Sequence, residues 1–267
     1  MLLCGGLLSY FLIAGICYFS LYIMHKKFWA HLRLSRKAWT TLQIRSEIRA
    51  SSLSLIIFGV FITTTYIARD LQLTRIYWHV SQRGWLYSLI SFIGLFLLHD
   101  SYFYFLHRLL HSVPILRKVH QTHHYSSNPS PWAAFSFHPF EAILSAFFFP
   151  VMAVAFPVQR FVFVFFIFTM VFTTVLYHCG YDLLSGLFRF RERSWLCFFS
   201  WVNSTRVHAL HHEFSNKNFG LYFTLWDRIF GTYKPVKMAY SLRYQNEDDI
   251  KTQELNREMD AFVSRTV

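Results

Sequence analysis

The sequence has few charged residues and very few acidic ones. Only 15% of its 267 residues are charged, and 14 Asp and Glu stand against 26 Lys and Arg. Soluble domains usually carry about a quarter of charged residues. Hydrophobic residues make up 54% of the chain, and Phe alone occurs 31 times. This composition excludes an ordinary soluble domain and is typical of a membrane protein.

The short motifs of several common cofactor sites are also missing. The four cysteines form no Cys-x-x-Cys pair, which argues against a disulfide framework and against a zinc knuckle. The chain contains no P-loop, no Gly-x-Gly-x-x-Gly and no haem-attachment Cys-x-x-Cys-His. Nucleotide, dinucleotide and c-type haem sites are therefore not indicated. The net charge of +12 is not gathered in a compact basic domain, so nucleic acid is not an expected partner.

Long hydrophobic runs are the most abundant feature that the chain does have. The four runs cover residues 2–24, 53–68, 85–106 and 142–177. A membrane-spanning helix needs roughly 20 apolar residues, so the last run is long enough for two short helices with a turn near 157–160. We expect an all-α, multi-pass membrane bundle of about four to five hydrophobic helices. The second run and either half of the last run could instead be re-entrant or interfacial.

The basic residues predict how these helices are oriented. Residues 25–51 hold seven Lys and Arg against one acid, whereas residues 69–84 hold only three Arg. The positive-inside rule places the first segment in the cytoplasm and the second on the opposite side. Following the crossings along the chain brings every histidine motif to the cytoplasmic side. We divide the chain into three regions. Residues 1–84 hold the first helices and a basic loop, residues 85–235 form the catalytic domain, and residues 236–267 form a C-terminal tail. An amphipathic helix is expected in that tail at 247–263.

Three short motifs concentrate histidines at the ends of the apolar runs. One reads His-x-x-x-His and two read His-x-x-His-His. Their members are His107, His111, His120, His123, His124, His208, His211 and His212. On a helix, residues three and four apart share a face, and imidazole is the commonest metal ligand. Eight imidazoles exceed the needs of one ion, so we predict two metals in a cytoplasmic cap on the bundle.

Five further residues could complete this site. His178 directly follows the last apolar run and is predicted as a ninth ligand. Asp182 lies four residues beyond it, and Asp100 lies seven residues before the first motif. Because ligating imidazoles usually donate their other N–H to a carboxylate or carbonyl, both acids are candidate catalytic-site residues. His99 and His138 are further candidates, either as ligands or as groups that orient one. Spacing alone does not select zinc, iron, copper or nickel.

The segments around these histidines resemble the fatty acid hydroxylase and sterol desaturase superfamily of integral membrane oxygenases. The matching segments are 99–104, 107–111, 120–124, 137–141, 177–182, 208–212, 218–220 and 225–232. They follow one another in the family's order within residues 99–235, about half of the chain. Asp182 stands where fatty acid hydroxylases often have a histidine, as it does in the sterol-acting members, which favours a sterol or a related polycyclic lipid.

The resemblance implies the chemistry and the partners. It implies two iron ions held by the eight motif histidines and by His178, with zinc as a possible substitute. It further implies that O2 and two supplied electrons hydroxylate or desaturate a sterol-like or fatty acyl C–H bond. The electrons would come from a cytochrome b5-like or ferredoxin-like donor. The host membrane would be a bacterial inner membrane or the endoplasmic reticulum. Two alternatives are a histidine-rich metal transporter and a zinc-dependent lipid hydrolase.

Overall fold

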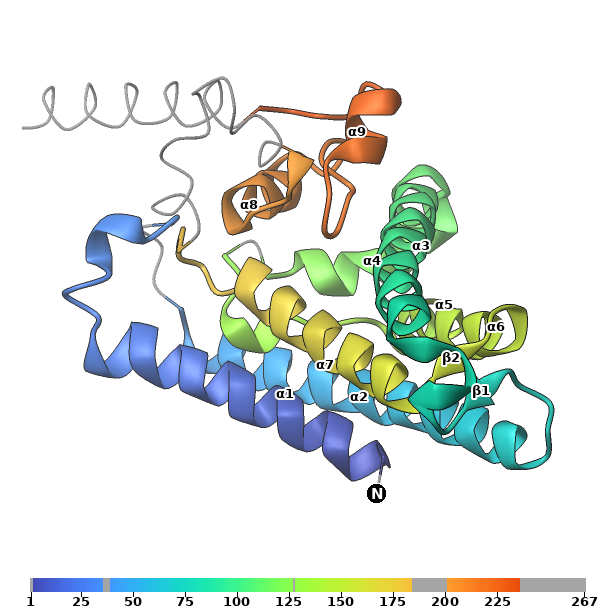
Figure 1. Cartoon of the computed structure of the whole chain (residues 1–267). Helices are drawn as coiled ribbons and strands as arrows, with labels where there is room; N and C mark the ends of the chain where they lie inside the picture. Colours follow the sequence, from blue (N-terminus) through green and yellow to red (C-terminus); the bar gives the residue numbers. More distant parts are fainter. Residues whose placement is uncertain (1, 36–38, 127, 184–200, 236–267) are drawn as a thin grey trace, which may run out of the picture. The chain divides into compact units, whose positions relative to one another are not determined.

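The protein is built almost entirely from helices. The computed structural model describes residues 2–35, 39–126, 128–183 and 201–235, and Met1–Tyr233 form one compact unit. Its sequence of elements confirms the predicted all-α fold class (Figure 1). The helix expected at 247–263 lies outside the described residues. The functional division at residue 84 stays a prediction.

Four helices are long and apolar enough to cross a membrane. They are α1 (Leu2–Tyr18) with its π-helical continuation η1 (Phe19–Met24), α2 (Thr41–Asp70), α3 (Gly84–Ser112) and α7 (Arg160–Tyr177). Many of their large apolar side chains point away from the protein; Trp85 is 80% exposed and Leu86 is 71% exposed. Large exposed apolar surfaces are unfavourable in water, whereas lipid accommodates them. The predicted count of four to five hydrophobic helices is confirmed at four among the described residues.

The apolar run at 142–177 is divided unequally. Its first part forms two short helices, α5 (Pro139–Ala146) and α6 (Phe148–Ala155), and its second part is α7. Pro150 has no N–H to donate to the carbonyl of Ala146, which explains why the helix is interrupted one turn before the proline. The turn lies at residues 156–159, close to the predicted position. Residues Pro139–Ala155 are shorter than the other candidate spans, so this half of the run does not add a fifth.

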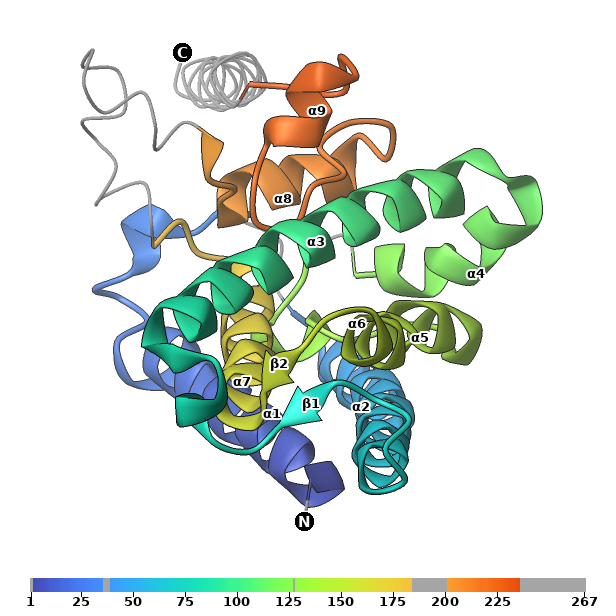
Figure 2. The ribbon, with the colours of Figure 1, turned by 45° about the vertical axis from the view of Figure 1, so that its right-hand side comes forward.

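A small parallel sheet joins the helix ends that lie farthest from the histidines. Strand β1 (Ile76–Tyr77) pairs with β2 (Val158–Gln159), with Ile76 opposite Val158. The sheet lies near the start of α3 and the start of α7 (Figure 2). The 3₁₀ turn η3 (Val80–Gln82) links β1 to α3. This end of the bundle is therefore fixed by backbone hydrogen bonds as well as by packing.

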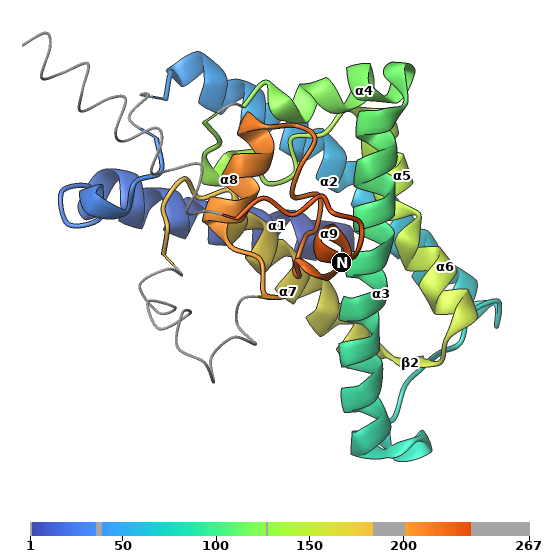
Figure 3. The same cartoon turned by 90° about the horizontal axis from the view of Figure 1, so that it is seen from above.

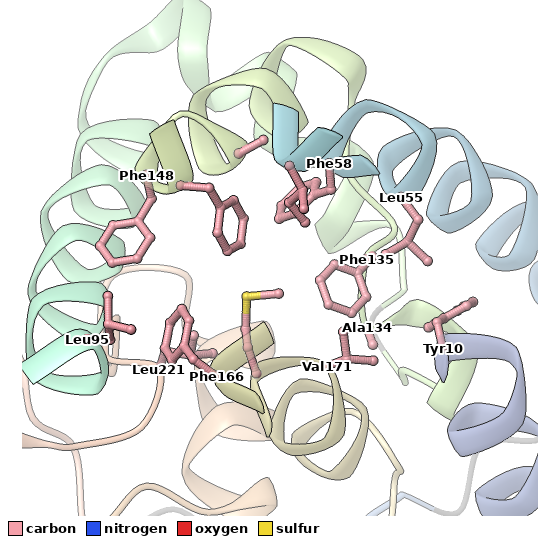
Figure 4. Close-up of a cluster of buried hydrophobic side chains, with 14 of the residues drawn as sticks. Tyr10, Leu55, Phe58, Leu95, Ala134, Phe135, Phe148, Phe166, Val171 and Leu221 are labelled. Carbon is pink, nitrogen blue, oxygen red and sulfur yellow. The ribbon is translucent and has the colours of Figure 1, made fainter. Parts of the chain in front are cut away.

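Aromatic side chains from several helices fill the core between the spans. Figure 4 shows part of this cluster, with Tyr10 from α1, Phe58 from α2, Phe148 from α6 and Phe166 from α7. The rings meet mostly edge to face; Phe58 and Phe135 are 5.8 Å apart between centroids, at 77°. Such pairs contribute about 0.5–1.5 kcal/mol beyond the area they bury. This aromatic core packs the membrane-spanning helices against one another.

Short helices cover one end of the bundle. They are α4 (Pro114–His124), α8 (Thr205–Glu213) and α9 (Leu225–Ile229), with the 3₁₀ turns η2 (Ala30–Leu32) and η4 (Pro131–Ala133). Helix α4 folds back against α3 and α5, and α8 packs on the end of α7 (Figure 3). Ser204 caps α8 by accepting a hydrogen bond from the N–H of Val207. These contacts bring α3, α4, α7 and α8, all of which carry or precede histidines, to one place.

A buried acid connects α2 to the loop between α4 and α5. Glu47 is 1% exposed; one carboxylate oxygen accepts a hydrogen bond from Gln43 Nε2 at 2.7 Å, and the other accepts one from the Ser130 hydroxyl. In the same region, Ser51 donates to the carbonyl of Trp132 at 2.7 Å. Glu47 therefore fixes the loop that leads from the histidines of α4 to α5.

We expect Glu47→Ala to destabilise the protein, because Gln43 and Ser130 would lose their buried acceptor. The cost of leaving buried donors unsatisfied is about 1–3 kcal/mol. Glu47→Gln keeps an acceptor and should cost less. Thermal unfolding in detergent measures both, with the exposed Arg49→Ala as control. An unchanged unfolding midpoint for Glu47→Ala would contradict this role.

Candidate metal centre

Nine histidines converge where α3, α4, α7 and α8 meet. One group consists of His107, His111, His120, His124 and His211, and the other of His123, His178, His208 and His212. Within each group the candidate ligand atoms all lie within 4.8 Å of one another. The second group is fully buried, and the first is partly exposed at His111 and His124. The structure thus brings together every histidine of the three motifs, and also His178.

The two His-x-x-His-His motifs divide their members between the groups. In α4, His120 and His124 enter the first group and His123 enters the second. In α8, His208 and His212 enter the second group and His211 enters the first. Residues four apart differ by about 40° around a helix, whereas adjacent residues differ by about 100°. The expectation that all three histidines of a motif point the same way is therefore wrong; only the pairs four apart do.

The ring nitrogens named Nε2 meet at short distances in both groups. In the first, His124 Nε2 lies 3.1 Å from the Nε2 atoms of His111, His120 and His211. In the second, the Nε2 atoms of His208 and His178 are 2.9 Å apart, and those of His178 and His123 are 3.3 Å apart. Metal–imidazole bonds are about 2.0–2.1 Å long, so two nitrogens bound side by side to one ion lie about 3.0–3.4 Å apart. The observed separations fit that requirement.

Backbone carbonyls orient three of these rings. His107 Nδ1 donates to the carbonyl of Phe219 at 2.9 Å, and His178 Nδ1 donates to that of Thr174 at 2.8 Å. His211 Nδ1 donates to the carbonyl of Lys217 at 2.7 Å. Because a carbonyl oxygen only accepts hydrogen bonds, the proton must sit on Nδ1. Each Nε2 is then unprotonated and has a lone pair for a metal.

Burial keeps these imidazoles in the neutral form. It lowers the pKa of His124 to about 4 and the pKa of His178 to about 4. It also lowers the pKa of His212 well below its ordinary value. A histidine must be neutral at its ligating nitrogen to bind a metal. Unprotonated lone pairs that face one another at about 3 Å repel, and a cation between them removes that repulsion. The donor set therefore fits metal ions.

Glu141 contacts the first histidine group, a position that the spacing of the motifs did not predict. Its Oε1 accepts a hydrogen bond from His120 Nδ1 at 2.7 Å, and the side chain is 3% exposed. Glu141 lies in the first turn of α5, which starts at Pro139. A sequence signal did exist, because an acid within an apolar segment is costly and is usually functional. Among the described residues, Glu141 thus orients the ring of a candidate ligand, His120.

The two predicted carboxylates lie elsewhere. Asp100 Oδ1 accepts hydrogen bonds from the backbone N–H groups of Tyr222 at 2.7 Å and Phe223 at 3.1 Å. Asp182 pairs with Arg206 at 2.7 Å. The structure corrects the expectation that these acids accept N–H groups from His107 and His178, because backbone carbonyls occupy both positions. Each acid instead holds a segment in place: Asp100 the loop after α8, and Asp182 the start of α8.

His99 and His138 lie outside both histidine groups. His99 is buried, and its Nδ1 lies 2.9 Å from the hydroxyl of Tyr222. His138 is exposed and caps α5; its Nδ1 accepts a hydrogen bond from the N–H of Phe140 at 3.2 Å. Neither residue belongs to the two groups of candidate ligands, although His99 lines the narrow apolar cavity beside the second group. A ligand role for either residue stays a prediction.

The loop after α8 supplies the carbonyl that orients His107. Asp227 holds this loop by accepting hydrogen bonds from the N–H groups of Phe219 at 2.9 Å and Gly220 at 2.8 Å. Asn203 donates to the carbonyl of Gly220 at 2.7 Å. A Cβ atom on Gly220 would lie 2.2 Å from the carbonyl oxygen of Phe223, so only glycine fits there.

Two different cavities adjoin the two groups. An open cavity of about 940 Å³ reaches His111, His120 and His124, and charged residues, Arg117, Lys118 and Glu213, also line it. A narrow apolar cavity of about 30 Å³ reaches the second group. Its lining includes His123, His178, His208, Phe103, Phe137 and Met170. The first group is therefore accessible to water and ions, and the second faces the apolar interior.

Comparison with known proteins identifies similar chains. A Delta(7)-sterol 5(6)-desaturase of Gibberella zeae is 27% identical over 230 residues, covering 86% of this chain and 66% of that protein. The lathosterol oxidase of Mus musculus is 24% identical over 232 residues, covering 86% of this chain and 72% of that protein. The chain thus spans about two thirds of the length of these relatives. No solved structure matches it.

A family comparison covers the histidine site. The model of the family described as fatty acid hydroxylase matches residues 92–232, which is more than half of the chain and includes all nine clustered histidines, Glu141 and Asp227. The predicted resemblance is thereby confirmed. The chain belongs to the fatty acid hydroxylase family.

Proposed function

We propose that this protein is a membrane-bound, non-haem di-iron oxygenase. It would use O2 and two supplied electrons to hydroxylate or desaturate a C–H bond of a lipid. The observation that carries this proposal is the convergence of nine imidazole Nε2 atoms in two adjacent groups beside an apolar cavity. The sequence relatives, which are named as sterol desaturases and lathosterol oxidases, support this reaction class.

The donor geometry supports two metal ions, one for each histidine group. Five nitrogens in one group and four in the other are too many for a single ion, since metal sites rarely take more than about six ligands. Iron is the proposed metal, and zinc is a possible substitute because imidazole suits both. When bound, the metal pair supplies the activation of O2 and the removal of hydrogen from an unactivated C–H bond.

The residues of the chain position the reactants and exclude water. Glu141 and the carbonyls of Phe219, Thr174 and Lys217 hold four imidazoles with their lone pairs directed inward. The apolar cavity marks where a lipid would approach His123, His178 and His208, and at about 30 Å³ it would have to widen to admit one. Its aromatic and aliphatic walls keep water away from this side of the site. The two histidine groups are already gathered, so substrate binding would need to open the apolar cavity but not to assemble the ligands.

A sterol or a related polycyclic lipid is the preferred substrate. The relatives at 24–27% identity are named for sterol reactions, and Asp182, paired with Arg206, stands where fatty acid hydroxylases often carry histidine. A fatty acyl chain is the other substrate class. Hydroxylation and desaturation share the first hydrogen removal and differ in the second step.

We further propose that the site faces the cytoplasm, in a bacterial inner membrane or in the endoplasmic reticulum. The seven basic residues of 25–51 support this orientation through the positive-inside rule. The electron donor would be a separate cytochrome b5-like or ferredoxin-like protein. The basic residues Arg117 and Lys118 at the open cavity would favour an acidic partner there.

The two alternative functions receive less support. A metal transporter would place ligands along a path across the membrane, whereas both described groups gather at one end of the spans. A zinc-dependent lipid hydrolase needs no electrons or O2, and the matching relatives are named as desaturases and oxidases.

We expect His123→Ala and His211→Ala each to reduce bound iron and to lower product formation below about 1% of wild type. This loss is beyond the 10–100-fold effect typical of groups that only orient a ligand. His123 belongs to one group and His211 to the other, so the two variants test both. Elemental analysis measures iron, and lipid mass spectrometry measures product. His25→Ala is the matched control, because His25 is exposed and lies outside both groups. Wild-type protein that is fully active with fewer than two irons per chain would refute the proposal.

We expect Glu141→Ala to weaken metal binding by about 10–100-fold, because His120 would lose the acceptor that orients its ring. Glu141→Gln retains an oxygen acceptor for Nδ1–H and should lose much less. Competition with a metal chelator measures the affinity of both variants. Equal affinities for the Ala variant and wild type would show that Glu141 does not support the site.

A further inference from the structure

A polar cavity lies at the end of the bundle away from the histidines. It has a volume of about 620 Å³, and its lining consists of Arg75, Tyr77, Gln82, Arg83 and Pro157. Four of these residues precede the segment that matches the family, 92–232. None of them takes part in the proposed reaction, so the cavity needs a separate explanation.

The surrounding structure fixes both arginines of this cavity. The N–H of Arg75 donates to the carbonyl of Ala153 at 2.7 Å, and the carbonyl of Arg75 accepts from the N–H of Val158 at 3.4 Å. The Nη1 of Arg75 donates to the carbonyl of Ala155 at 3.5 Å. The guanidinium carbon of Arg83 lies 5.2 Å from the ring centroid of Tyr87, within cation–π range. Tyr87 in turn donates its hydroxyl proton to the carbonyl of Pro157 at 2.9 Å. The two guanidinium groups are thus held beside one opening.

No acid among the described residues balances the charges of these arginines. Among the described residues, neither Arg75 nor Arg83 forms an ion pair. Two more arginines lie at the same end: Arg69, which pairs with Asp70, and Arg160. Both stack on Trp78, each 4.0 Å from the ring centroid. The opening therefore carries a positive potential that an anion would neutralise.

The position of the cavity along α3 indicates the source of that anion. Arg83 directly precedes α3, and His107 lies 23 residues beyond its first residue, Gly84. At 1.5 Å per residue this is about 35 Å along the helix, close to the roughly 30 Å thickness of a bilayer's hydrocarbon core. Figure 3 shows α4 and β2 at opposite ends of α3. If the histidines lie at one surface of the membrane, the cavity therefore lies at the level of the lipid headgroups of the other surface.

The side chains beside the cavity suit a lipid. Trp85 and Leu86 are 80% and 71% exposed at the start of α3, and Phe161 is 61% exposed at the start of α7. Exposed tryptophan at the end of a span is typical of the membrane interface. Acyl chains attached to a headgroup in the cavity could lie along these apolar side chains.

We propose that this cavity binds the phosphate group of an anionic phospholipid. Arg75 and Arg83 would donate paired N–H groups to the phosphate oxygens, a geometry that guanidinium groups favour. Gln82 and Tyr77 would line the rest of the headgroup site. This lipid is a structural ligand on the surface opposite the histidines and is not the substrate.

Native mass spectrometry of the full chain in detergent tests this site with phosphatidylglycerol and phosphatidylcholine as probes. We expect wild-type protein to retain phosphatidylglycerol in preference to phosphatidylcholine. The double variant R75Q/R83Q should lower phosphatidylglycerol affinity by about tenfold or more, as the loss of two charge-assisted contacts implies. R45Q is the matched control, because Arg45 is exposed near the other end of α2. If the double variant fails to fold, R83Q alone should still give a severalfold loss.

Two results would overturn the proposal. One is equal retention of the two lipids by wild-type protein, or undiminished phosphatidylglycerol retention by R75Q/R83Q. The other comes from thermal unfolding with added ligand. We expect phosphatidylglycerol, but not millimolar inorganic phosphate, to raise the unfolding midpoint of wild type. Equal protection by inorganic phosphate would mean that the site takes a free anion instead of a lipid.

Discussion

The hydrogen bond from an imidazole Nδ1 to a fixed acceptor is the interaction on which the candidate metal centre depends. It places the proton on one nitrogen and directs the lone pair of the other inward. Phe219, Thr174 and Lys217 provide carbonyl acceptors, and Glu141 provides a carboxylate. The acceptors come from a loop, a span and a short helix far apart in the chain. The packing of those elements is therefore a condition for metal binding as well as for stability.

The same dependence explains the roles of residues that never approach the histidine nitrogens. Asp227 and Asp100 accept backbone N–H groups of the loop that carries Phe219. Glu47 holds the loop between α4 and α5, and so connects the α4 histidines to Glu141. Buried carboxylates are costly unless they are hydrogen-bonded. Each of these acids has partners, and each fixes backbone next to the site.

The helix bundle separates two chemically different surfaces. At one end, neutral imidazoles gather around positions suited to cations. At the other end, Arg75 and Arg83 line an opening suited to an anion. Because α3 runs between the two ends, its length sets their separation. A rigid span can thus keep the reactive site at one membrane surface while the opposite end is held by lipid headgroups.

Local sequence was sufficient to identify the spans and the nine clustered histidines, because hydropathy and spacing along a helix are properties of neighbouring residues. It could not show that His123 and His211 each belong to a different group from the other two histidines of their motif. It also gave no role to Glu141 and expected Asp100 and Asp182 to orient ligands, which carbonyls do instead. The physical reason is that an acceptor's identity depends on which distant backbone packs beside each ring. The sequence determined which side chains could bind metal, and the tertiary structure decided how they are divided and held.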